Sequence, residues 1–73
     1  MKFLVIEIQQ NADGTVGNFV FTFDTANEAE SKYHAILSAA AVSSVPHHSA
    51  IMMNSHGGYI NSQCYDHVSE PEA

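Results

Sequence analysis

Five histidines and one cysteine are the side chains of this 73-residue sequence that are best suited to bind a metal ion. Zinc sites gather three or four such ligands, usually from short spacings such as C-x2-C or H-x3-H. Here two histidines are adjacent and diverge on an extended backbone, and Cys64 and His67 lie three apart, which on a strand means opposite faces. We therefore expect no metal and no cofactor. A minor alternative, metal or ligand binding, would use His47, His48, His56 or His67.

No combination of residues predicts catalysis. Cys64 shares a side of its expected strand with Ile60 and Val68, and packing there would disfavour the thiolate that a nucleophile needs. The acidic residues form no pair typical of acid–base chemistry. Gly57-Gly58 lacks the lysine and the following helix of a phosphate-binding loop. We expect a protein that is not an enzyme.

The charge balance excludes two classes of partner. Eight acidic residues stand against two basic ones, Lys2 and Lys32, so the formal net charge is −6. Nucleic-acid backbones and anionic membrane surfaces are bound through several Lys or Arg contacts, which this chain cannot supply. A small acidic protein can instead occupy a basic groove as an inhibitor or decoy of a host enzyme. The acids are dispersed along the chain, so we keep this as the alternative function.

The sequence contains no segment typical of export or membrane insertion. Glu7 interrupts the apolar start and no small-residue cleavage site follows, which argues against a signal peptide. The apolar stretch 35–42 is far shorter than the ~20 residues that cross a bilayer. A single cysteine allows no internal disulfide and fits a reducing compartment. These features predict a cytoplasmic protein.

The first part of the chain predicts a β-hairpin. Residues 3–9 are apolar up to Ile8 except at Glu7, a pattern typical of a central strand covered on both faces. Asp13-Gly14 is a strong turn signal. The following segment, 15–23, alternates so that three phenylalanines at period two share one face.

The second part predicts a helix and another hairpin. Thr25 and Glu28 form a T-x-x-E capping box, in which the glutamate reaches back to the Thr25 amide, and Pro46 lies beyond the helix end. Segments 49–54 and 59–68 alternate on either side of a glycine turn. An apolar stripe at helical spacing should face the sheet: Ala29, Tyr33, Ile36, Leu37 and Ala40.

These elements predict one α+β domain over residues 1–68, followed by a polar, frayed tail over 69–73. The element order is β-β-α-β-β. A right-handed crossover gives a four-stranded, mainly antiparallel sheet of strand order 2-1-3-4, with one helix on one face.

One helix leaves the other sheet face without cover. We place the helix over the Leu4 side of the first strand, so the opposite side would be an exposed apolar face, and such a face usually marks an interaction site. Covering it would also supplement a small core. The expected contact residues are Phe3, Val5, Val16 and Val20, extended by Tyr59 and Tyr65. The edge strands, the second and fourth, lack blunting lysines and prolines and could pair with a partner instead. The sequence does not choose between face and edge.

Four segments carry a resemblance to known proteins: residues 1–9 (MKFLVIEIQ), the Asp13-Gly14 turn, residues 30–41 (ESKYHAILSAAA) and residues 42–50 (VSSVPHHSA). Together they resemble a group of small uncharacterised proteins encoded in phages and prophages of gut Gram-positive bacteria, often among structural genes. The resemblance covers most of the chain, contains no catalytic motif and carries over no binding residues. It implies a phage accessory or virion-associated role, in the host cytoplasm or the virion.

The expected function is therefore non-enzymatic. It consists of protein–protein contact and self-association, with the partner being the chain itself (a homo-oligomer) or another phage or host protein.

Overall fold

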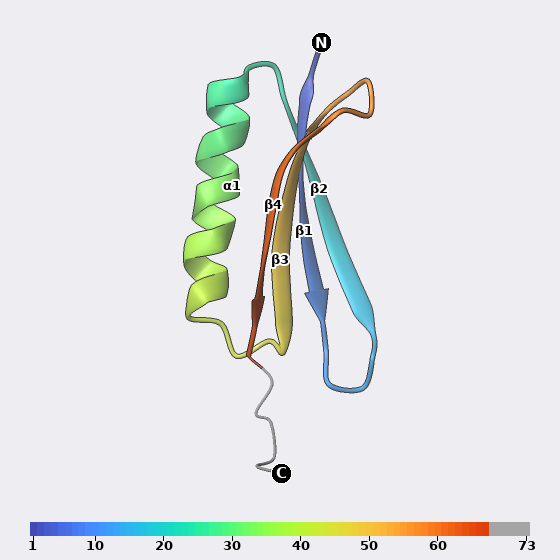
Figure 1. Cartoon of the computed structure of the whole chain (residues 1–73), viewed down its shortest axis with the longest axis vertical. Coiled ribbons are helices and arrows are strands. Elements are labelled where there is room, and N and C mark those ends of the chain that lie inside the picture. Colours follow the sequence, from blue (N-terminus) through green and yellow to red (C-terminus); the bar gives the residue numbers. More distant parts are fainter. Residues whose placement is uncertain (68–73) are drawn as a thin grey trace.

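The computed structural model describes residues 1–67, which form four strands and one helix (Figure 1). The elements are β1 (Phe3–Gln10), β2 (Val16–Phe23), α1 (Ala26–Ala41), β3 (His47–Asn54) and β4 (Tyr59–Asp66). The predicted β-β-α-β-β order is confirmed. The expected tail over 69–73, and Val68 as the end of the last strand, lie outside the described residues.

The sheet has the predicted strand order, β2-β1-β3-β4, and every neighbouring pair is antiparallel. β1 is therefore central, as its apolar run requires. Its residue Ile6 lies opposite Val20 on β2 and Ile51 on β3. Figure 1 shows α1 alongside one face of this sheet.

Both hairpin turns depend on a glycine in the left-handed region. Gly14 has φ +90° and Gly57 has φ +89°, which glycine adopts without the strain that a side chain would cause. In the first turn, the Asp13 carboxylate accepts a hydrogen bond from the Thr15 backbone N–H at 3.0 Å. In the second, the Asn54 side-chain oxygen accepts from the backbone N–H of Gly58 at 2.9 Å. The loops thus satisfy their own backbone groups.

Thr25 begins the helix, as predicted, but the capping contacts differ in one respect. Its hydroxyl oxygen accepts from the Glu28 backbone N–H at 3.2 Å. The Glu28 carboxylate does not reach back to the Thr25 amide. It accepts a hydrogen bond from the Thr25 hydroxyl at 3.0 Å instead. The Glu28 carboxylate therefore bonds the side chain of Thr25 and not its backbone.

The core lies between α1 and one face of the sheet. All five residues of the predicted helical stripe are buried, which confirms that face of the helix. From the sheet, Val5 is fully buried and Ala50 and Met52 join it. Four larger side chains pack around this centre: Phe3, Phe21, Phe23 and Tyr65.

The prediction that α1 covers the Leu4 side is wrong. In the β1–β2 register, Val5 lies opposite Phe21 and Phe3 opposite Phe23, and residues directly opposite share a face. Phe3 and Val5 therefore belong to the phenylalanine face. Burying aromatic rings removes more apolar area from water than burying Leu4 and its neighbours would, so the helix covers this face.

The helix cap offers a direct test of this architecture. Thr25→Ala removes the acceptor for the Glu28 backbone N–H and should lower the free energy of unfolding by about 1 kcal/mol. Ser31→Ala, an exposed change within the same helix, should shift it by no more than about 0.5 kcal/mol. Urea denaturation of both variants measures the difference. Equal stabilities would contradict a cap at Thr25.

Candidate functional site

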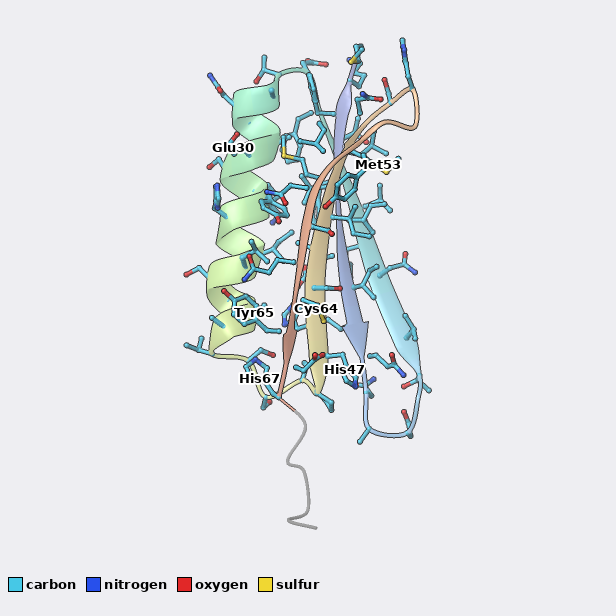
Figure 2. The ribbon with its side chains drawn as sticks, in the orientation of Figure 1. Glu30, His47, Met53, Cys64, Tyr65 and His67 are labelled. Atoms are coloured by element: carbon cyan, nitrogen blue, oxygen red, sulfur yellow. The ribbon has the colours of Figure 1, made fainter. Side chains whose placement is uncertain are left out.

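The sheet face turned away from α1 carries a continuous group of apolar side chains. Figure 2 shows Tyr65 on the helix side of the sheet and Met53 on the opposite side. The strand alternation and the pairing registers place seven apolar residues on the same side as Met53, which we call the open-face patch: Leu4, Ile6, Ile8, Val16, Val20, Ile51 and Met53. Val16 is 58% exposed and Val20 55%. The patch spans β1, β2 and β3.

Small uncharged polar side chains surround the patch on the same face: Asn18, Thr22, Ser49, Ser62 and Cys64. An apolar centre with a polar margin is the usual composition of a protein–protein interface. Each of these margin residues can hydrogen-bond without bringing a full charge to the contact.

Charges occur on this face only as pairs near the ends of the sheet. The Lys2 ammonium pairs with the Asp24 carboxylate where β1 begins and β2 ends. At the other end, His47 Nδ1 lies 2.6 Å from Asp66 Oδ1 across the β3–β4 pair. Within residues 1–67, no further charged side chain lies on this face. Glu7 points to the helix side, and the other described acids lie on α1 or in the first turn.

Cys64 lies beside the second of these pairs and is exposed, so its expected packing is wrong. Its thiol lies 3.3 Å from Asp66 Oδ1. Partial burial, together with the adjacent Asp66 carboxylate, raises the pKa of Cys64 and disfavours the thiolate. The pKa of Asp66 is lowered, chiefly by its hydrogen bond with His47 and then by the thiol. The cluster does not form an activated nucleophile.

The structure divides the predicted contact residues between the two faces. Val16 and Val20 lie on the open face, and their role in contact stays a prediction. Phe3, Val5 and Tyr65 lie on the face that α1 covers, so their expected place on an exposed face is corrected. Tyr59 is exposed near the β3–β4 turn, with its hydroxyl 3.2 Å from that of Ser62. Sequence reasoning missed five residues of the patch: Leu4, Ile6, Ile8, Ile51 and Met53.

The four candidate metal-binding histidines lie apart from one another. His47 is on the open face, His48 is buried on the helix side, and His56 is in the β3–β4 turn. His67 Nε2 lies 2.6 Å from the Ala40 carbonyl oxygen, and its ring stacks on Tyr65. Within residues 1–67, no group of three or more His, Cys, Asp or Glu side chains is arranged to hold a metal ion. The geometry gives the metal alternative no support.

A buried polar network lies on the helix side, at the one polar break in the β1 run. His48 Nε2 lies 2.6 Å from Glu7 Oε2, and the side chains are 6% and 17% exposed. Gln9 Nε2 donates to the same carboxylate oxygen at 3.0 Å. The imidazole fixes β3 against β1, because a charge-assisted bond in a low-dielectric site holds both partners in one geometry. This network is structural.

A hollow of about 420 Å³ opens at the sheet end near the first turn. It is lined by Gln10, Asn11, Ala12, Gly14, Pro46, His47 and His67. Both imidazoles already hold a partner within the fold, His47 through Asp66 and His67 through Ala40. The open-face patch is therefore the stronger functional candidate.

Among the described residues, no helix has the length and apolar character to cross a bilayer. Comparisons with protein-family models, with curated proteins and with solved structures gave no match.

Removing one partner of the buried Glu7–His48 pair should destabilise the fold. His48→Ala leaves the Glu7 carboxylate buried with Gln9 alone and should cost about 3 kcal/mol, the lower end of the range for breaking a buried pair. His34→Ala removes an exposed partner of Glu30 and should cost no more than about 0.5 kcal/mol. Urea denaturation measures both.

A double variant, Glu7→Leu with His48→Leu, should recover most of that loss, since a buried ion pair can be replaced by apolar packing. If His48→Ala unfolds at the same urea concentration as the unmodified protein, the network does not stabilise the fold.

Proposed function

We propose that this chain is a non-enzymatic protein that acts by protein–protein contact, and that it associates with a second copy of itself through the open-face patch. One observation carries the proposal: a chain of net charge −6 keeps the centre of one sheet face apolar, and the carboxylates on that face lie near the sheet ends, Asp24 beside Lys2 and Asp66 beside His47. Exposed apolar patches of this kind are typical of interaction sites.

The charge distribution favours a second copy as the occupant. Two chains of charge −6 repel each other wherever their carboxylates meet. On the open face, the described carboxylates lie near the sheet ends and away from the centre of the patch: Asp24 pairs with Lys2, and Asp66 lies beside His47. Two copies can therefore approach through this face with little like-charge repulsion, whereas α1 presents Glu28 and Glu30 to solvent.

The size of the face also fits a dimer. Four strands about 4.8 Å apart and eight residues long at about 3.4 Å per residue give a flat area of roughly 500 Å² per copy. Two such faces reach about 1,000 Å², the lower limit for a specific interface. The contact would also extend the core, which for a domain of this size supplies only about 3–5 kcal/mol.

We place this contact function in a phage accessory or virion-associated protein, in the host cytoplasm or the virion, with the chain itself or another phage or host protein as partner. The sequence resemblance alone supports that setting. An acidic inhibitor or decoy has less support, because the described carboxylates are distributed over the first turn, α1 and the sheet ends.

A charge at the centre of the face tests the proposal. Ile6→Glu should convert the oligomer to smaller species, because association would then bury two unpaired carboxylates. Sedimentation velocity at micromolar concentration measures the mass, and circular dichroism checks the fold. Ala35→Glu makes the same charge change on the exposed side of α1 and should leave the mass unchanged.

If Ile6→Glu impairs folding, Met53→Glu places the charge on the same face from β3. A monomeric unmodified protein, or equal masses for the Ile6→Glu and Ala35→Glu variants, would rule out self-association through this face.

A further inference from the structure

β2, at one edge of the sheet, contains none of the residues that usually protect an exposed edge; the one nearby lysine, Lys32 of α1, lies over the Phe21 ring with its ammonium 4.2 Å from the ring centroid. β2 runs for eight residues in unbroken register with β1, and it contains no charged residue and no proline. Only Phe21 and Phe23 among its residues are partly covered. At the other edge, the β3–β4 register is interrupted between Met52 and Met53, and β4 ends on Asp66. Bulges and charges hinder edge pairing, so β2 is the edge open to a further strand.

The hydrogen-bond phase shows which backbone groups of β2 are free. The Asn11 backbone N–H donates to the Thr15 carbonyl at 2.9 Å, in the same register as the β1–β2 pair. Hydrogen-bonded and non-hydrogen-bonded positions alternate in an antiparallel pair. The odd-numbered residues of β2 therefore bond to β1. Four residues point their N–H and C=O groups away from the sheet: Val16, Asn18, Val20 and Thr22.

These four residues select one antiparallel register between two β2 strands. When Asn18 lies opposite Val20 of a second copy, Val16 lies opposite Thr22, and all four outward residues of each copy are hydrogen-bonded. Any shift along the strand leaves some of them unpaired. We propose that a second copy of this chain pairs its β2 with this β2 in that register, across a two-fold axis at Phe19, and so joins two sheets into one.

Phe19 supports this register because the fold of one chain leaves it uncovered. It belongs to the phenylalanine face, yet it is 55% exposed and lies outside the core that Phe21 and Phe23 join. On the axis, Phe19 meets Phe19 of the second copy at a non-hydrogen-bonded position, where Cα atoms are about 4.5 Å apart. Aromatic pairs at such positions stabilise antiparallel sheets. Gly17 then lies opposite Phe21 and leaves its ring room.

A second copy fits this edge better than a foreign peptide does. The strand matches itself in one complete register, and β2 brings no charge to the contact although the chain carries −6. This edge contact is independent of the open-face contact proposed above, because the edge two-fold axis is perpendicular to the sheet and the face axis lies parallel to it. Together the two contacts would close an assembly of four chains.

Cysteine cross-linking tests the edge register directly. In a Cys64→Ser background, Phe19→Cys should give predominantly disulfide-linked dimers under mild oxidation, seen by non-reducing electrophoresis. Gly17→Cys should remain unlinked, because Gly17 faces position 21 of the second copy. A Cβ at Gly17 meets no atom within 4 Å, so this control is tolerated. Phe19 points away from the open face, so face contact cannot produce the link.

A proline substitution at one of the outward-facing backbone N–H groups provides a second test, which is read from the mass of the oligomer. Asn18→Pro removes one donor of the edge without touching the β1 ladder, and the preceding Gly17 accommodates the proline. It should halve the mass measured by sedimentation, whereas Asn18→Ala, which keeps the N–H, should not.

The proposal is overturned if Phe19→Cys links no better than Gly17→Cys, or if Asn18→Pro keeps the unmodified mass. If the unmodified protein has the mass of four chains, and Ile6→Glu halves that mass as Asn18→Pro does, both the face contact and the edge contact are supported. If Ile6→Glu alone lowers the mass, the face contact stands without the edge.

Discussion

The antiparallel register of β1 against β2 is the constraint on which the rest of this structure depends. By setting Val5 opposite Phe21, it gathers the phenylalanines on one face and leaves Leu4, Ile6 and Ile8 of β1 on the other. The single helix can cover only one of these, and it covers the aromatic face, where more area is removed from water. The open-face patch is what remains, so the candidate interaction surface is a consequence of hairpin pairing.

The helix-covered face and the open face of the sheet also differ in their polar side chains. On the covered face, the half-buried Glu7 carboxylate contacts both His48 Nε2 and the Gln9 amide, and Nδ1 of the buried His48 has no hydrogen-bond partner among the described residues. On the open face, the polar groups are small and uncharged, or they lie in pairs at the sheet ends. A buried ionic network holds one strand arrangement in place, whereas a neutral margin allows another surface to approach without removing water from an unpaired charge.

Local patterns in the sequence predicted the elements, and the errors concern contacts between them. The hairpins, the helix, its cap residue and the strand order follow from alternation, turn residues and helical spacing. Which face the helix covers depends on register, which could have been obtained by pairing residues outward from the Asp13-Gly14 turn. The Glu7–His48 contact joins residues 41 apart and had no local signal beyond one acid in an apolar run. The exposure of Cys64 likewise depends on which face of the sheet stays open.

The central position of β1 has a consequence for synthesis. Its partner on one side, β2, follows within a few residues, but its partner on the other, β3, begins only at His47, beyond the helix. Contacts of such long sequence separation form slowly because chain entropy must first be lost. During synthesis, the first hairpin therefore forms with both its aromatic face and its aliphatic face exposed to water. Until α1 and β3 have been synthesised, these exposed apolar surfaces and the unpaired edge of β1 favour aggregation.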